Sequence, residues 1–133
     1  MELIKVVLYA EDDPDDRTWV SEACKALNVE VRIEFLDNGK HVFQYLSSCK
    51  PAAMPSLIVL DLNMPELDGR QTLQKIREHP NYRHIPVAIV TTSSNAIDRE
   101  VCNRLGANLF LTKPDSHTQW QQIVRELEPF IGN

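Results

Sequence analysis

The alternation of five short apolar runs with five stretches of helical periodicity constrains the fold of this chain most strongly. Runs of this length, several of them bounded by prolines, are typical of strands buried on both faces of a parallel sheet. Strict alternation with short connections predicts an α/β fold, a doubly wound parallel sheet with right-handed crossovers. The runs occupy roughly residues 4–10, 31–36, 57–61, 86–91 and 108–112.

The stretches between and after these runs predict five helices. Pro14 suits the first turn of the first helix, and Gly106 is a natural stop for the fourth. The second helix is expected to end before Pro51 and the third before Pro80. The apolar positions with helical spacing are Val20, Ala23, Cys24 and Leu27, then Val42, Phe43 and Leu46, then Leu67, Leu73 and Ile76, then Ile97, Val101 and Leu105, and finally Trp120, Ile123, Val124 and Leu127.

Length and composition narrow the class of protein. A chain of 133 residues favours one domain with one core. The net charge of −5, without a block of Lys or Arg, argues against nucleic acid as the main partner. No apolar stretch approaches the roughly 20 residues of a membrane span, and the start has no signal-peptide pattern. Three widely spaced cysteines indicate reduced thiols in a cytoplasmic protein.

Acidic residues follow two of the predicted strands. Asp61 closes the run 57–60, and Glu11, Asp12 and Asp13 follow the first run. Because the carboxyl ends of parallel strands share one edge of the sheet, we expect these four carboxylates to converge where such folds bind ligands. Carboxylates that close repel one another, and a divalent cation relieves the repulsion. The all-oxygen set suits Mg²⁺, with Mn²⁺ as a substitute, and Mg²⁺ at such sites indicates phosphate chemistry.

Asp61 beside such a metal predicts a nucleophile toward phosphorus. Lys113, after the fifth run, would neutralise phosphoryl charge, and the hydroxyl of Thr91, at the end of the fourth run, would contact a phosphoryl oxygen. Each residue alone also has an ordinary explanation, as a surface lysine, a strand threonine or a turn. We interpret Asp15 and Asp16 only as acids that favour the start of a helix through its dipole.

These motifs identify a resemblance over essentially the whole chain. The chain resembles the receiver domain of bacterial two-component response regulators, most closely the single-domain type that serves phytochrome-like histidine kinases. The resemblance implies a flavodoxin-like sheet with strand order 2-1-3-4-5 and five helices, with residues 1–133 forming one receiver domain without an output domain. The matching segments are Glu11-Asp12-Asp13, Asp61 with Met64-Pro65 and Asp68-Gly69, Pro86 to Thr91, Gly106-Ala107 and Lys113-Pro114.

The resemblance implies a role for each site residue. Asp61 would be the phosphoacceptor, and Mg²⁺ would be bound by Asp12, Asp61 and the backbone carbonyl of Asn63, with Glu11 acting through a water. Lys113 would contact the phosphoryl group and would precede a cis peptide bond to Pro114. Thr91 and Phe110 would form the switch, because Thr91 would move toward phosphorylated Asp61 and Phe110 would fill the vacated space. Phe110 stands where tyrosine is frequent in the family, so packing alone would report the state.

The expected function is that of a stand-alone, non-enzymatic phosphoacceptor that assists its own phosphorylation and dephosphorylation. Its partners would be a sensor histidine kinase or histidine phosphotransfer protein, a downstream protein target, and a second copy bound through the face of the fourth helix, fifth strand and fifth helix. An alternative is a Mg²⁺-dependent phosphatase with an aspartyl nucleophile. Such enzymes have an acid two residues after the nucleophile, where this chain has Asn63, a residue that cannot act as a general acid.

Overall fold

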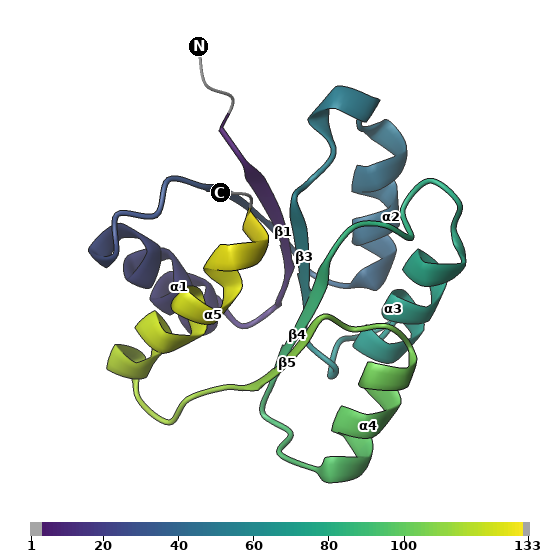
Figure 1. Cartoon of the computed structure of the whole chain (residues 1–133). Helices are drawn as coiled ribbons and strands as arrows, with labels where there is room; N and C mark the ends of the chain where they lie inside the picture. Colours follow the sequence, from purple (N-terminus) through teal and green to yellow (C-terminus); the bar gives the residue numbers. More distant parts are fainter. Residues whose placement is uncertain (1–3, 132–133) are drawn as a thin grey trace.

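The computed structural model describes residues 4–131 and has a central sheet of five parallel strands in the order β2-β1-β3-β4-β5 (Figure 1). This order confirms the flavodoxin-like expectation. It places the ends of β1 and β3 side by side, with β4 and β5 next in line. The strands are β1 (Val6–Ala10), β2 (Arg32–Leu36), β3 (Leu57–Leu60), β4 (Val87–Thr91) and β5 (Leu109–Thr112).

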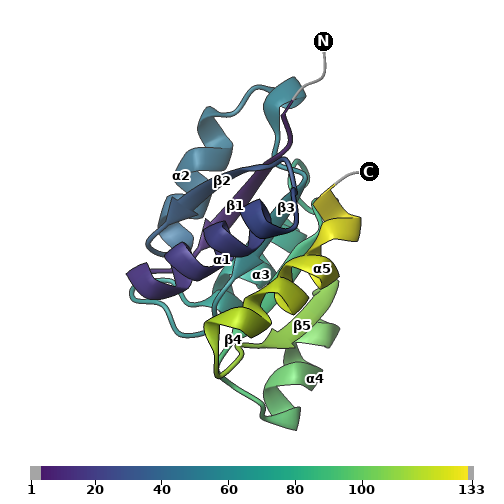
Figure 2. The same cartoon turned by 90° about the vertical axis from the view of Figure 1, so that its left-hand side faces the viewer.

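Five helices cover the two faces of the sheet. Helices α1 and α5 lie on one face, and α2, α3 and α4 lie on the other (Figure 2). No helix in residues 4–131 is long and apolar enough to cross a membrane. The helices are α1 (Pro14–Ala26), α2 (Gly39–Ser48), α3 (Gly69–Glu78), α4 (Ala96–Arg104) and α5 (Trp120–Ile131), with short 3₁₀ turns at Pro51–Ala53 and His117–Gln119.

Alternate residues of the inner strands face two apolar layers. In β1, Leu8 and Ala10 pack toward α2, α3 and α4, whereas Val7 and Tyr9 pack toward α1 and α5. All four side chains are buried, because helices cover both faces. The same alternation in β3 and β4 explains why these segments are apolar without interruption, as the sequence predicted.

Two predicted boundaries were wrong. Strand β1 begins at Val6 instead of Ile4, and Ile4 is 71% exposed. Leu67 was expected inside the third helix, but α3 begins only at Gly69. Asp68 stops the helix from starting earlier, because its side chain accepts a hydrogen bond from the Gln71 N–H, and the Gln71 side chain accepts one from the Asp68 N–H.

The predicted helix start at Pro14 and the stop at Gly106 were confirmed. Asp13 caps α1, and Pro14 occupies its first turn. Gly106 follows α4 with φ of +98°, a left-handed conformation that glycine adopts without a steric cost. The three cysteines are free thiols, which is consistent with the reduced state expected from their spacing.

Candidate functional site

The ammonium group of Lys113 lies among three carboxylates at the carboxyl edge of the sheet. Its Nζ atom is 2.5 Å from Oε1 of Glu11, 2.7 Å from Oδ2 of Asp16 and 3.0 Å from Oδ2 of Asp61. All four side chains are about nine-tenths buried or more. The residues that directly follow β1, β3 and β5, together with one residue of α1, therefore form one buried ionic cluster.

Backbone contacts fix Glu11 at the end of β1. Its Oε2 atom accepts a hydrogen bond from the Asp13 N–H at 3.1 Å, which leaves Oε1 for Lys113. The Glu11 carbonyl accepts a hydrogen bond from the Arg17 guanidinium at 2.6 Å. Arg17 also pairs with Asp37, so one side chain connects the site loop to the segment after β2.

A close backbone approach fixes Asp61 at the end of β3. The Asp61 N–H donates to the Ala10 carbonyl, and Oδ1 of Asp61 accepts a hydrogen bond from the Asn63 N–H at 3.2 Å. A Cβ atom at position 69 would lie only 2.3 Å from the Asp61 carbonyl oxygen. The Asp68-Gly69 pair is therefore more than a turn, because Gly69 lets the start of α3 pack directly against the site.

Burial and neighbouring charges shift the pKa values of Glu11 and Lys113 in opposite directions. Desolvation raises the pKa of Glu11 to about 7, although its contacts with Lys113 and the Asp13 N–H lower it and the charge of Asp61 raises it. Burial lowers the pKa of Lys113, but its contacts with Asp16, Glu11 and Asp61 outweigh burial and raise it overall. The lysine therefore stays charged beside its carboxylate partners.

The four acids predicted to converge do not all do so. Asp12 is exposed at the rim of the site, and its carboxylate has no hydrogen-bond or ion-pair partner within residues 4–131. Asp13 turns away, because its side chain accepts a hydrogen bond from the Asp15 N–H and caps α1. The convergence of Asp13 with the others was therefore wrong, whereas Glu11 and Asp61 were correctly placed together.

The donor chemistry fits a divalent cation. Within the described part of the chain, no three acidic, histidine or cysteine side chains are grouped as a ready-made metal cage. Mg²⁺ does not need such a cage, since it commonly takes one or two carboxylates and completes its shell with waters and other oxygens. Asp12 and Asp61, together with the carbonyl of Asn63, could supply such oxygens, and the ammonium beside Glu11 and Asp61 shows that this space already suits a cation.

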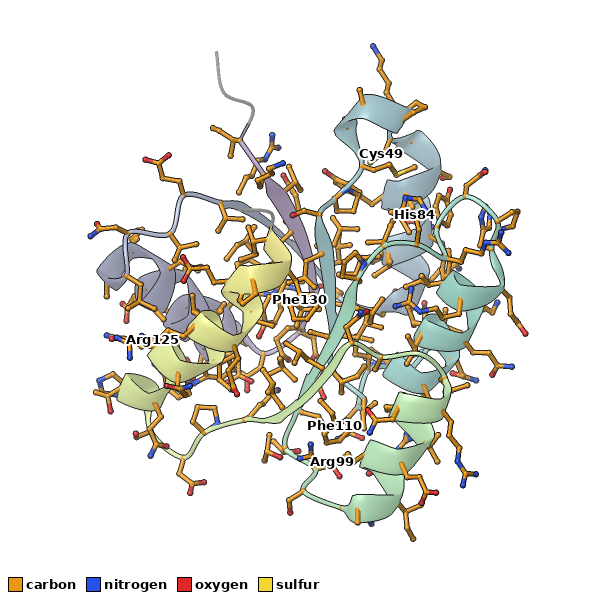
Figure 3. The ribbon with its side chains drawn as sticks, viewed as in Figure 1. Cys49, His84, Arg99, Phe110, Arg125 and Phe130 are labelled. Carbon is orange, nitrogen blue, oxygen red and sulfur yellow. The ribbon has the colours of Figure 1, made fainter. Side chains whose placement is uncertain are left out.

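Thr91 and Phe110 lie on the two strands that follow the acids. Thr91 is fully buried at the end of β4, and its hydroxyl accepts a hydrogen bond from the Ser93 N–H at 3.4 Å. Its carbonyl accepts one from the Lys113 N–H at 2.7 Å, which ties the lysine to β4. Phe110 is buried in β5 near α4, where Figure 3 shows its ring beside Arg99.

Sequence reasoning missed one member of the cluster and predicted one wrong bond geometry. Asp16 was interpreted only as a favourable helix-start acid, but it is 8% exposed and contacts Lys113. Its position three residues before the apolar Trp19 and four before Val20 places it on the inward stripe of α1, and that spacing was the available signal.

The Lys113–Pro114 bond is trans, not cis as the resemblance implied, and trans is the commoner form before proline.

This fold, with an acid, a lysine and a threonine at the carboxyl edge of its sheet, defines the receiver class. The chain matches the family model described as response regulator receiver domain over residues 7–125. The chain therefore belongs to the response regulator receiver domains, the phosphoacceptor modules of two-component signalling.

Three relatives illustrate the similarity. Response regulator Rcp1 of Synechocystis is 33% identical over 95% of this chain and 88% of its own length. The match to the Mn²⁺-bound crystal structure of Rcp1 covers 95% of this chain and 93% of the Rcp1 chain, with a TM-score of 0.82 and 32% identity. The phosphorylated cyanobacterial phytochrome response regulator RcpA covers 96% of this chain and 94% of its own, with a TM-score of 0.86 and 32% identity.

A third solved structure is that of the receiver domain of sensor histidine kinase PA1611 from Pseudomonas aeruginosa. It has a magnesium ion coordinated in its active-site cleft. The match covers 98% of this chain and 100% of that one, with a TM-score of 0.77 and 25% identity. The fold is therefore shared with proteins whose structures were solved phosphorylated or with a divalent cation bound.

Proposed function

We propose that Asp61 accepts a phosphoryl group from a phosphohistidine of a kinase or phosphotransfer protein. The observation that carries the proposal is the 3.0 Å contact between the Lys113 ammonium and Oδ2 of Asp61 in the buried ionic cluster. An oxygen of Asp61 forms a bond to phosphorus as the phosphorus–nitrogen bond to the donor histidine breaks. The imidazole leaves with its electron pair and takes up a proton, and the product is an aspartyl phosphate.

Mg²⁺ is the proposed cofactor, and Mn²⁺ substitutes for it. Asp12, Asp61 and the carbonyl of Asn63 are the proposed ligands, with Glu11 acting through a water. When bound, the ion supplies positive charge that neutralises phosphoryl oxygens. Lys113 supplies a second positive charge, and the buried hydroxyl of Thr91 is the proposed hydrogen-bond donor to the modified Asp61.

The proposed output is a change in protein contacts on the face of α4, β5 and α5. Two apolar side chains of α4 support a protein contact there, because Ile97 is 69% exposed and Val101 is 36% exposed. The proposed partners are a phytochrome-type histidine kinase, a downstream target and a second copy of the chain. The negative net charge argues against nucleic acid, and a cytoplasmic location is proposed from the reduced thiols.

Autophosphorylation tests the acceptor. Intact mass is measured after incubation with Mg²⁺ and acetyl phosphate for the wild type, for Asp61→Asn and for the metal-ligand variant Asp12→Asn. We expect one phosphoryl adduct in the wild type, none in Asp61→Asn or in chelator, and a slower but detectable adduct in Asp12→Asn. Continued release of phosphate from a stable phosphoester would instead favour the phosphatase alternative, which the family assignment does not favour.

A further inference from the structure

Asp16 is the one acid of the buried cluster that has no role in the proposed chemistry. It lies in the first turn of α1, and its carboxylate contacts Lys113 at 2.7 Å. Within residues 4–131 that carboxylate has no other hydrogen-bond or ion-pair partner. The inward residues Val20 and Cys24, four and eight positions later, pack α1 onto the sheet and so fix where Asp16 points.

One oxygen from each of the three carboxylates lies within 3.0 Å of the Lys113 ammonium, and the contact with Asp61 is a hydrogen bond. The second carboxylate oxygen of Glu11 and that of Asp61 each accept a backbone hydrogen bond, from Asp13 and Asn63 respectively. Both side chains are therefore fixed to the loops that follow β1 and β3. Both also belong to the proposed cation site, Asp61 as a direct ligand beside Asp12 and Glu11 through a water. A cation at that position weakens their attraction for the ammonium, and Asp16 is then the remaining anion that can hold it.

We propose that Asp16 is a positioning residue that keeps the ammonium of Lys113 beside Asp61 when a divalent cation also draws on Asp61 and Glu11. The inference rests on the proposed phosphoacceptor function and deepens it. With Asp16 as an additional partner, the Lys113 ammonium and the divalent cation can both face the phosphoryl group. Without Asp16, the ammonium is held only by Glu11 and Asp61. In a variant that lacks the Asp16 carboxylate, the Lys113 ammonium and the divalent cation compete for Glu11 and Asp61.

The matched pair Asp16→Asn and Asp15→Asn tests this role. Both changes remove one carboxylate from the first turn of α1, but Asp15 is exposed and has no contact with Lys113. The Mg²⁺ dissociation constant is measured by titration calorimetry without any phosphodonor. The rate of adduct formation is measured at saturating Mg²⁺ with acetyl phosphate. Thermal unfolding in chelator verifies that each variant is folded.

We expect Asp16→Asn to weaken Mg²⁺ binding severalfold and to slow phosphorylation by about tenfold, since a hydrogen bond to a charged group is lost. Asp15→Asn should change neither quantity by more than about twofold. Asp16→Glu, which restores the carboxylate, should recover part of both effects. In a Lys113→Ala background, Asp16→Asn should slow phosphorylation no further, because Asp16 acts through the lysine.

The outcomes separate this inference from the proposed function. If wild type forms no adduct that depends on Asp61, the phosphoacceptor function itself fails. If wild type is phosphorylated but Asp16→Asn matches Asp15→Asn in Mg²⁺ binding or in rate, the positioning role is overturned and the acceptor remains. An undiminished effect of Asp16→Asn in the Lys113→Ala background would also overturn it.

Discussion

Arg99 of α4 covers the ring of Phe110 in β5. The guanidinium carbon lies 4.9 Å from the centre of the ring, and Nη1 donates a hydrogen bond to the Phe110 carbonyl at 3.2 Å. The two side chains lie together between the end of the sheet and α4 (Figure 3). Phe110 has no phenolic hydroxyl, and the contact with Arg99 connects its ring to α4.

Replacing Arg99 with alanine should lower the free energy of unfolding by about 1 kcal/mol, because the cation–π contact and the hydrogen bond are lost. Arg99→Lys should retain part of this stability. Urea unfolding measures the change. The control is Arg104→Ala on the same helix, which pairs with the exposed Glu100 one turn away, and its effect should stay below about 0.5 kcal/mol. Equal losses in Arg99→Ala and Arg104→Ala would show that the ring contact is without energetic effect.

The raised pKa of Glu11 predicts a pH dependence of stability in the absence of metal. Desolvation raises this pKa from 4.5 to about 7, so the folded chain binds a proton that the unfolded chain releases between these values. The stabilising contribution of Glu11 is therefore complete below about pH 4.5 and is lost as the pH rises through about 7. Glu11→Gln should gain stability relative to the wild type across that window.

Urea unfolding in chelator from pH 5 to pH 8 measures this difference. The exposed Glu22 provides the control, because Glu22→Gln removes a carboxylate from α1 outside the ionic cluster. A stability difference between Glu11→Gln and wild type that stays constant with pH would contradict the prediction.

Arg77 joins three segments at the far end of α3. Its guanidinium donates to the carbonyls of Arg83, Ile85 and Gly106 and to the side chain of Asn108. Arg77→Lys should lower the free energy of unfolding by about 2 kcal/mol, because one ammonium cannot reproduce this fork of donors. Thermal or urea unfolding measures it.

Lys75→Ala on the same helix is the control for Arg77→Lys. Lys75 is exposed, so its loss should cost less than about 0.5 kcal/mol. If Arg77→Lys is as stable as Lys75→Ala, the hydrogen bonds of Arg77 contribute little to the fold.

Gly69→Ala should damage the site and the fold together. The new Cβ would lie 2.3 Å from the Asp61 carbonyl oxygen, and the backbone must shift to make room. We expect a loss of about 2 kcal/mol in stability and slower phosphorylation of Asp61. Gln74→Ala, an exposed change on α3, should affect neither. A Gly69→Ala variant with the unfolding midpoint and phosphorylation rate of the wild type would refute this close-packing argument.

The main features of the fold follow from local patterns. Continuous apolar segments such as Leu57–Leu60 indicate strands covered on both faces, and Pro14 and Gly106 mark helix ends through their backbone preferences. The placement of Asp61, Lys113 and Thr91 at one edge follows from the direction of parallel strands. Leu67 shows the limit of periodicity, because the Asp68 cap decides where the helix begins.

Patterns along the chain were enough to predict the architecture, the family and the convergence of Glu11 with Asp61. The packed structure was needed to show that Asp13 caps a helix while Asp16 enters the ionic cluster, and that Arg77 and Arg99 connect distant segments. The physical reason is that strand and helix patterns depend on neighbours along the chain. The partner of a long charged side chain depends instead on which helix face packs against the sheet, and residues such as Asp16 and Lys113 meet only after that packing is complete.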